Sequence, residues 1–301
     1  MRTARPVPLP SFFILGAAKA GTTTLYDLLR QHPQVFLPVD KEPMFFSRDE
    51  YYRRGKDWYA NAFFRRAGGF RARGEATPHY LYWAGKVAPR VGQAYGATPP
   101  RFIIILRDPV ERARSAYWNM VRDGAEPLPF TEALQKEEER IRLHWDELYA
   151  AGSMRYGYVR GGLYASQIGE FLKLFPGELF HILLLDDLRT GPASVMKSLC
   201  VFLHIDPGLE FKPGRSNPAA QPRSQAVHRV LREPSRVKSL LKSVLPRGIR
   251  YRARNLLAQA NLEESDPPEL EPDALQFLRE RFAPENAALA EIIGRDLSHW
   301  N

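Results

Sequence analysis

The segment from Phe12 to Thr24 constrains the fold of this chain more than any other. It begins with four apolar residues, continues through six residues bounded by Gly16 and Gly21, and ends in an amphipathic pattern that starts at Thr22. The apolar run predicts a buried parallel strand, and the pattern after Gly21 predicts a helix. A strand, a glycine loop and a helix in this order form a site where backbone N–H groups bind a phosphate-like anion.

This loop differs from the loop of ATP-binding proteins at one position. The ATP-type sequence G-x-x-x-x-G-K-[S/T] carries a lysine directly after its second glycine. In this chain Thr22 takes that place, and the lysine, Lys19, lies inside the loop. We therefore expect a phosphate-like ligand other than Mg-ATP. The residues expected to bind it are Lys19, Ala20, Gly21, Thr22, Thr23 and Thr24.

Composition limits what the chain can be. Its 301 residues, 44% of them hydrophobic, suffice for one large α/β domain or two small ones. No window approaches the roughly 18 uncharged apolar residues of a membrane-spanning helix. The first residues lack the apolar stretch of a secretory signal, and the one cysteine, Cys200, predicts a buried inert thiol and no internal disulfide. These features lead us to expect a cytoplasmic protein.

The net charge of +9 is concentrated in one window. Residues 212–254 contain 12 Lys and Arg against one acidic residue, which gives +11 and leaves the rest near −2. Such a window predicts a local anionic partner. One interpretation is a solvated helix face. The other is an amphipathic basic segment over residues 235–260 that rests on the inner face of an anionic membrane, or gates an anionic or lipid-linked substrate.

Short apolar runs and helical patterns alternate along the chain. Strands are expected at Phe12–Leu15, Val35–Leu37, Ala72–Glu75, Arg101–Leu106 and Leu179–Leu185. Helices are expected at Thr22–Gln31, Pro109–Arg122, Thr131–Ala150, Tyr164–Leu174 and Ala193–Leu203. This alternation predicts a P-loop-like three-layer α/β fold, with a central parallel sheet flanked by helices and its ligand at the carboxyl ends of the strands.

We expect one domain over residues 1–301. Its parts would be a nucleotide-binding α/β core over residues 12–203, a basic loop and helical cover over 204–265, and terminal helices within 266–301. Two separate terminal helices are expected, at Asp273–Phe282 and Glu285–Ile293.

A second candidate anion site follows the strand expected at Arg101–Leu106. Arg107 lies at the carboxyl edge of that strand, the proline after Asp108 begins a helix, and Ser115 comes two turns later. An arginine binds phosphate through two parallel hydrogen bonds, and a serine hydroxyl adds one donor. Alternatively, Arg107 pairs with Asp108 or Glu111, and Asp108 only caps the helix. Together with the glycine loop, the site suggests a ligand with phosphates at both ends.

With these motifs the chain resembles the sulfotransferases that use 3′-phosphoadenosine-5′-phosphosulfate (PAPS), in particular bacterial members similar to heparan sulfate N- and O-sulfotransferase domains. The resemblance runs from about Phe12 to Leu203 and resumes at the terminal helices. It rests on K-x-G-T-T at Lys19–Thr23, E-x-x-F-F at Glu42–Phe46, E-x-x-x-x-Y at Glu75–Tyr80, L-R-D-P-x-x-R-x-x-S at Leu106–Ser115 and G-x-Y at Gly162–Tyr164.

The resemblance implies roles for these residues. The glycine loop would bind the 5′-phosphosulfate, Arg107 with Ser115 the 3′-phosphate, and Tyr164 would belong to the same nucleotide site. Lys19 would neutralise the charge that builds on the leaving phosphate, so that no divalent metal is needed. The family places the general base at Glu42, where the following aromatic pair is expected to raise its pKa by desolvation. Glu75 is the alternative base.

Two departures from the family pattern affect other residues. Where the heparan enzymes carry a lysine after the second glutamate, this chain has Ala76, and Lys41 is a candidate to supply that charge beside the acceptor. His79 could face the acceptor as well, or it could be a histidine satisfied within the fold. The disulfide that pins the family's C-terminal loop is absent. Candidates to close over the 3′-phosphate are Arg215, Ser216, Asn217, Arg223 and Ser224.

The sequence thus predicts an enzyme that transfers a sulfuryl group from PAPS to a hydroxyl or amine of a carbohydrate, lipid or small metabolite. One alternative is a P-loop kinase, which would need magnesium and a lysine at the position of Thr22. A second is a basic nucleic-acid-binding protein, which would leave Lys19 and Arg107 unexplained. We expect no nucleic-acid partner. We also expect no metal site, because the seven histidines show no zinc-ligand spacing.

Overall fold

Five parallel strands form the centre of the molecule in the order β2-β3-β1-β4-β5. The computed structural model of the chain describes residues 7–143, 155–212, 220–222, 262–264 and 269–301. The strands of the sheet are β1 (Phe12–Gly16), β2 (Val35–Phe36), β3 (Ala72–Ala76), β4 (Arg101–Leu106) and β5 (Phe180–Leu184). All five predicted strands are therefore present, and β1 and β4, which precede the two candidate anion sites, are neighbours.

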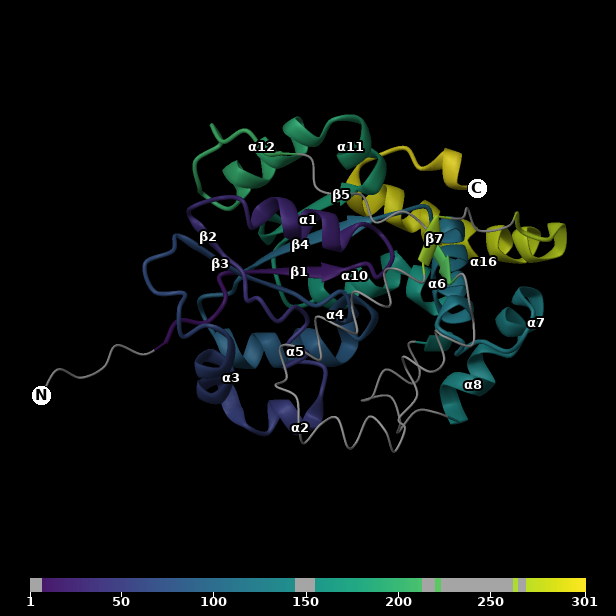
Figure 1. Cartoon of the computed structure of the whole chain (residues 1–301), viewed down its shortest axis with the longest axis horizontal. Helices are drawn as coiled ribbons and strands as arrows, with labels where there is room; N and C mark the ends of the chain where they lie inside the picture. Colours follow the sequence, from purple (N-terminus) through teal and green to yellow (C-terminus); the bar gives the residue numbers. More distant parts are fainter. Residues whose placement is uncertain (1–6, 144–154, 213–219, 223–261, 265–268) are drawn as a thin grey trace, which may run out of the picture.

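Alternate residues of the inner strands pack into two separate cores, as expected of a sheet buried on both faces. In β1, Phe13 and Leu15 join one core, whereas Phe12 and Ile14 join the other. One face is covered by α1 (Thr22–Leu29), α11 (Leu185–Thr190) and α12 (Pro192–Phe202), and the other by α3 (Gly55–Phe63), α4 (His79–Tyr82), α5 (Ala84–Tyr95) and α10 (Tyr164–Leu172) (Figure 1). The predicted three-layer α/β fold is confirmed.

A third apolar cluster lies beside the sheet. It joins α6 (Pro109–Arg122), α7 (Phe130–Gln135) and α16 (Pro272–Ile293), and α8 (Glu137–Leu143) follows α7 directly. Helix α16 contacts α6, α7 and α10, so the end of the chain packs against helices that lie between β4 and β5 in the sequence. The remaining elements are α2 (Asp49–Tyr52), the single 3-10 turns η2 (Arg160–Gly162), η3 (Gly177–Leu179) and η4 (Ser298–Trp300), and the two-stranded ladder of β6 (Ala220–Pro222) with β7 (Leu262–Glu264).

Helix α16 corrects the prediction of two terminal helices. The expected break lies at Pro284, yet the helix runs through it from Pro272 to Ile293. Its buried residues Leu278, Phe282, Asn286 and Leu289 follow helical spacing across the proline. Packing of this continuous stripe therefore outweighs the backbone hydrogen bond that proline cannot donate.

Two further predictions differ from the structure. The helix expected at Thr131–Ala150 is two helices within the described residues, because α7 ends at Gln135 and α8 begins at Glu137. Helices α2, α3, α4 and α5 were not predicted.

The basic window lies outside the described residues over 213–219 and 223–254, so the cover over 204–265 and the membrane-facing segment 235–260 remain predictions.

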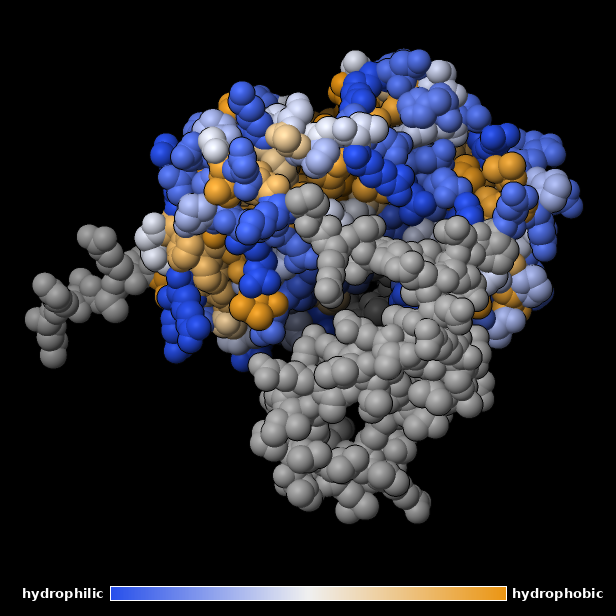
Figure 2. Space-filling view, turned by 45° about the horizontal axis from the view of Figure 1, so that its top comes forward, coloured by the Kyte–Doolittle hydropathy of each residue, from blue (hydrophilic) through white to orange (hydrophobic). Residues whose placement is uncertain are grey.

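One face of the molecule carries its exposed apolar side chains in separate patches. Figure 2 shows orange patches divided by hydrophilic side chains on the face in view. The large apolar residues most exposed to solvent are Val39, Leu143, Val201 and Leu174. Among the described helices, none has the length and apolar character needed to cross a bilayer.

Candidate functional site

The glycine loop joins β1 to α1 in the space between two other helices. A side chain at Gly16 would come within 2.7 Å of Leu81 Cβ in α4, and one at Gly21 within 2.7 Å of Leu185 Cδ1 in α11. Gly21 also has a φ of 95°, in the left-handed region that glycine favours, and it is the N-cap of α1. At both positions a side chain would clash with a neighbouring helix, so each position requires glycine. The loop is tied to the sheet by the backbone N–H of Ala17, which donates to the carbonyl of Ile105 at 2.7 Å.

Helix α1 begins at Thr22 without a side-chain cap, so its first N–H groups have no partner within the helix. Thr22 is buried, and Thr23 and Thr24 are partly exposed. This arrangement leaves an N-terminus with three hydroxyl-bearing residues at the carboxyl edge of the sheet. Such an end of a helix attracts an anion through its dipole and its N–H groups.

Lys19 extends from the loop toward α6. Its Nζ donates to Asn119 Oδ1 at 3.0 Å. Its side chain is exposed to solvent within a concave pocket, where the surrounding protein thins its hydration shell. This desolvation, followed by repulsion from Arg122, lowers the pKa of Lys19 from 10.5 to about 8. At neutral pH the side chain is therefore still a cation, available to an anion in the pocket.

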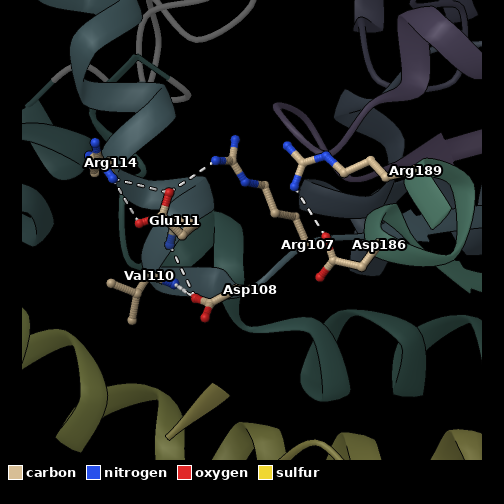
Figure 3. Close-up of polar contacts among 7 residues, drawn as sticks. All are labelled: Arg107, Asp108, Val110, Glu111, Arg114, Asp186 and Arg189. Atoms are coloured by element: carbon tan, nitrogen blue, oxygen red, sulfur yellow. Dashed lines mark hydrogen bonds and ion pairs between the residues drawn. The ribbon is translucent and has the colours of Figure 1, made fainter. Parts of the chain in front are cut away.

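Arg107 stands at the end of β4, beside the start of α6 (Figure 3). Its Nη2 donates to Glu111 Oε2 at 3.1 Å, and Arg114 holds the other oxygen of the same carboxylate at 3.0 Å. Asp108 accepts from the backbone N–H groups of Val110 and Glu111 at 2.8 and 3.1 Å and so caps α6. The alternative stated for this segment therefore holds in part: Arg107 pairs with Glu111, and Asp108 caps the helix.

Ser115 follows Glu111 by four residues in α6 and lies partly exposed on the same side of that helix. Tyr164, in contrast, is buried, and its hydroxyl donates to the backbone carbonyl of Arg107 at 2.9 Å. Tyr164 thus holds the end of β4 in place through this hydrogen bond. Arg107 and Ser115 are the groups of this set that reach solvent.

Glu42 and Lys41 belong to a loop that lies over the end of β3. The backbone N–H of Glu42 donates to the carbonyl of Ala76 at 3.2 Å, and Glu42 has a φ of 63°. Lys41 Nζ donates to Thr23 Oγ1 at 2.7 Å, which joins this loop to the start of α1. Burial lowers the pKa of Lys41, with Glu42 acting in the opposite direction. The structure thus brings Lys41 and Glu42 next to the glycine loop.

His79 lines the same pocket as Lys19. Burial lowers its pKa, while the nearby charge of Glu42 raises it and that of Lys41 lowers it. His79 therefore lies in the field of both residues. Arg112, the second arginine of the motif at Leu106–Ser115, also lines the pocket, together with Asn119, Arg155 and Gln167, which the sequence analysis did not single out. Asn119 could have been found, because it follows Ser115 by one helical turn.

Glu75 has no exposed surface and is not among the residues that line this pocket. Its carboxyl group accepts from Thr77 Oγ1 at 2.6 Å and from the hydroxyls of Tyr59 and Tyr80. Burial raises its pKa from 4.5 to about 7, although these hydrogen bonds act in the opposite direction. Tyr80 in turn accepts from the backbone N–H of Phe46 at 3.2 Å. Glu75 therefore contacts the tyrosines that hold the loop of Glu42 in place, and it does not face the open pocket.

The aromatic pair Phe45 and Phe46 also supports this loop. Both side chains are buried, and Phe45 stacks on Tyr59 with ring centroids 4.4 Å apart. They anchor the loop in the core below Glu42, which is itself partly exposed.

Arg223 and Ser224, like Arg215, Ser216 and Asn217, lie outside the described residues. Within the described chain no group of three or more His, Cys, Asp or Glu side chains is arranged to hold a metal ion.

Comparison with known proteins agrees with this geometry. A family model described as the sulfotransferase domain matches residues 9–221. A crystal structure of a sulfotransferase from Alicyclobacillus acidocaldarius is 30% identical, with a TM-score of 0.70, over 98% of this chain and 99% of that one.

Two curated relatives act on heparan sulfate by their names. The human bifunctional heparan sulfate N-deacetylase/N-sulfotransferase 3 is 27% identical over 97% of this chain, which spans only 31% of that protein. The mouse heparan sulfate glucosamine 3-O-sulfotransferase 5 is 26% identical over 96% of this chain and 74% of that protein. The predicted resemblance is confirmed, and the chain belongs to the sulfotransferase family.

Proposed function

We propose that this protein transfers a sulfuryl group from PAPS to a hydroxyl or amine of an acceptor. The observation that carries the proposal is the placement of Lys19 and Arg107 after the neighbouring parallel strands β1 and β4. One end of the nucleotide would lie on the glycine loop, and its 3′-phosphate would lie on Arg107 and Ser115. A P-loop kinase fits less well because Thr22 occupies the lysine position of ATP-type loops.

The reaction assigns a separate task to each side of the pocket. The acceptor oxygen or nitrogen attacks sulfur and forms the new bond while its proton passes to the carboxylate of Glu42. The bond between sulfur and the bridging oxygen breaks, and its electron pair stays on the phosphate of adenosine 3′,5′-bisphosphate. The ammonium of Lys19 stabilises that developing charge. Glu42 is the group we assign as general base, because it is partly exposed and Glu75 is fully buried.

The acceptor we favour is a carbohydrate hydroxyl or amine, with lipid and small-metabolite acceptors as the other classes. The names of the two heparan sulfate relatives support the carbohydrate. Lys41 and His79 would contact the acceptor, since Lys41 adjoins Glu42 and His79 lines the pocket. A cytoplasmic location, with peripheral attachment to the inner membrane face through residues 235–260, remains part of the proposal. A nucleic-acid partner is not part of the proposal.

A binding and turnover experiment tests this function. Adenosine 3′,5′-bisphosphate should raise the melting temperature of the full chain without added metal, whereas ATP with magnesium should raise it far less. Incubation with PAPS and a library of glycans, lipids and phenols should then release adenosine 3′,5′-bisphosphate together with a sulfated product. Equal stabilisation by both nucleotides, or strict dependence on magnesium, would favour the kinase instead.

A further inference from the structure

We propose that Arg189 is an additional binding group for the 3′-phosphate and makes the site selective for nucleotides that carry this phosphate. The proposal rests on the proposed function, because it assigns a residue to the nucleotide site described above. Arg189 belongs to α11, on a different strand connection from Arg107 and Ser115. None of the sequence motifs discussed above includes it.

The topology brings Arg189 to the same edge of the sheet as Arg107. Strands β4 and β5 are parallel neighbours, and their last paired residues are Leu106 and Leu184. Arg107 follows the first strand directly, and α11 starts directly after the second, with Arg189 one turn further on. In Figure 3 the guanidinium groups of Arg107 and Arg189 lie side by side, each extending from its own strand connection.

Two neighbouring cations repel each other, and an anion bound between them offsets that repulsion. Arg189 is close enough to lower the pKa of Arg107, although burial is the larger cause and Glu111 acts in the opposite direction. Each guanidinium is held by one carboxylate at 3.1 Å, Arg107 by Glu111 and Arg189 by Asp186. A guanidinium has five N–H donors, so within the described residues both keep donors for a further anion. A phosphate oxygen would satisfy both cations at once.

Helix α11 is fixed in place, so the position of Arg189 is set in advance of binding. Asp187 accepts from the backbone N–H of Leu184 at 3.0 Å and receives two hydrogen bonds from Arg295 at 2.5 and 2.9 Å. Leu185 packs directly over Gly21 of the glycine loop. The helix therefore connects the loop expected to bind the 5′-phosphosulfate with the side chain assigned here to the 3′-phosphate. The side chain of Arg189 is 58% exposed and open to a ligand from solvent.

Calorimetric titration of the full chain with two nucleotides tests the assignment. Adenosine 3′,5′-bisphosphate and adenosine 5′-monophosphate differ only in the 3′-phosphate. Arg189→Gln should weaken binding of the bisphosphate about tenfold, the size of one charged hydrogen bond, and leave the monophosphate within about twofold. The control is Arg281→Gln, which removes an equally exposed arginine that pairs with Glu138 of α8, and it should change neither affinity.

A second variant tests the assignment with Arg189 kept in place. Asp186→Asn removes the carboxylate that competes for Arg189 and should strengthen binding of the bisphosphate selectively. This gain should vanish in the double variant with Arg189→Gln, because it depends on the arginine. An equal loss for both nucleotides in Arg189→Gln, or a gain that survives in the double variant, overturns the proposal. If the bisphosphate binds the wild type no better than the monophosphate, the proposed function itself fails.

Discussion

At the scale of single residues, the proposed chemistry depends on two carboxylates, of which the family resemblance placed Glu42 first and Glu75 second as the general base. Glu42 and Glu75 both occupy motif positions, and each was a candidate base. The structure separates them, because Glu42 lies in a partly exposed loop and Glu75 lies among the hydroxyls of Tyr59, Thr77 and Tyr80 with no exposed surface. Their roles should therefore be separable by experiment.

Glu42→Gln should lower kcat about a hundredfold, because the amide keeps the shape of the side chain but cannot take the proton. Lys19→Ala should cause a loss of similar or greater size by removing the charge that stabilises the leaving phosphate. Binding of adenosine 3′,5′-bisphosphate should survive in Glu42→Gln. Turnover of PAPS and calorimetric titration measure these effects. Full activity in Glu42→Gln, with loss in Glu75→Gln, would transfer the role of base to Glu75.

The pKa of Lys19 leads to a prediction for the dependence of activity on pH. Because that pKa is lowered to about 8, the ammonium is charged below pH 8 and neutral above it. The kcat/KM for PAPS, which reports the free enzyme, should therefore fall as the pH rises through about 8. In Lys19→Arg any remaining activity should keep its value to higher pH, because arginine stays protonated. An unchanged alkaline limb in that variant would show that another group causes the fall.

One residue assigned to the candidate site could not be found by sequence reasoning, for a physical reason. Lys19, Arg107 and Ser115 lie within motifs, so local spacing was sufficient to predict them as candidates. Arg189 comes next to Arg107 only because β5 pairs with β4, a contact between segments far apart in the chain. A pattern in one segment carries no information about such a neighbour.

At the scale of elements, the strands were predicted better than the helices. β1, β4 and β5 are short runs dominated by apolar residues, the pattern expected of strands in a sheet covered on both faces. Helices α2 and α4 have only four residues each, and α5 contains Pro89, a local signal against a helix, although its buried residues follow helical spacing. In α16 the local signal of Pro284 predicted a break, but the buried stripe on both sides of it keeps one helix. Tertiary packing decided where local preference was misleading.

The continuous α16 can be tested at Pro284, whose side chain is exposed. Pro284→Ala should raise the free energy of unfolding by about 1 kcal/mol or more, because alanine restores a backbone donor and removes the clash of the ring with the preceding turn. Chemical denaturation measures this change. A matched control is Ala287→Gly, an exposed position one turn later, which should lower stability by about 1 kcal/mol in a helix. Destabilisation by Pro284→Ala would show that the helix is truly interrupted there.

At the scale of the whole molecule, two buried carboxyl groups affect both the stability of the fold and the segments that hold the site in place. Glu75 supports the Glu42 loop, and Glu137 of α8 accepts from the backbone N–H groups of Val159 and Arg160 at 2.7 and 2.8 Å. Burial raises the pKa of each from 4.5 to about 7. Both groups hold regions that border the pocket, so the state of these carboxyls affects stability and site geometry together.

Stability should therefore fall as the pH rises from about 4.5 to about 7, because the folded chain holds protons on these carboxyls that the unfolded chain has already released. Glu75→Gln removes one of the two groups, and its free energy of unfolding should decline less steeply across this interval than that of the wild type. The full difference for one group is on the order of 3 kcal/mol. Urea denaturation at several pH values measures both slopes. The control, Glu50→Gln, removes an exposed carboxyl group and should leave the wild-type slope unchanged. If Glu75→Gln and the wild type decline equally, Glu75 is ionised in the folded protein throughout, and its hydrogen bonds outweigh its burial.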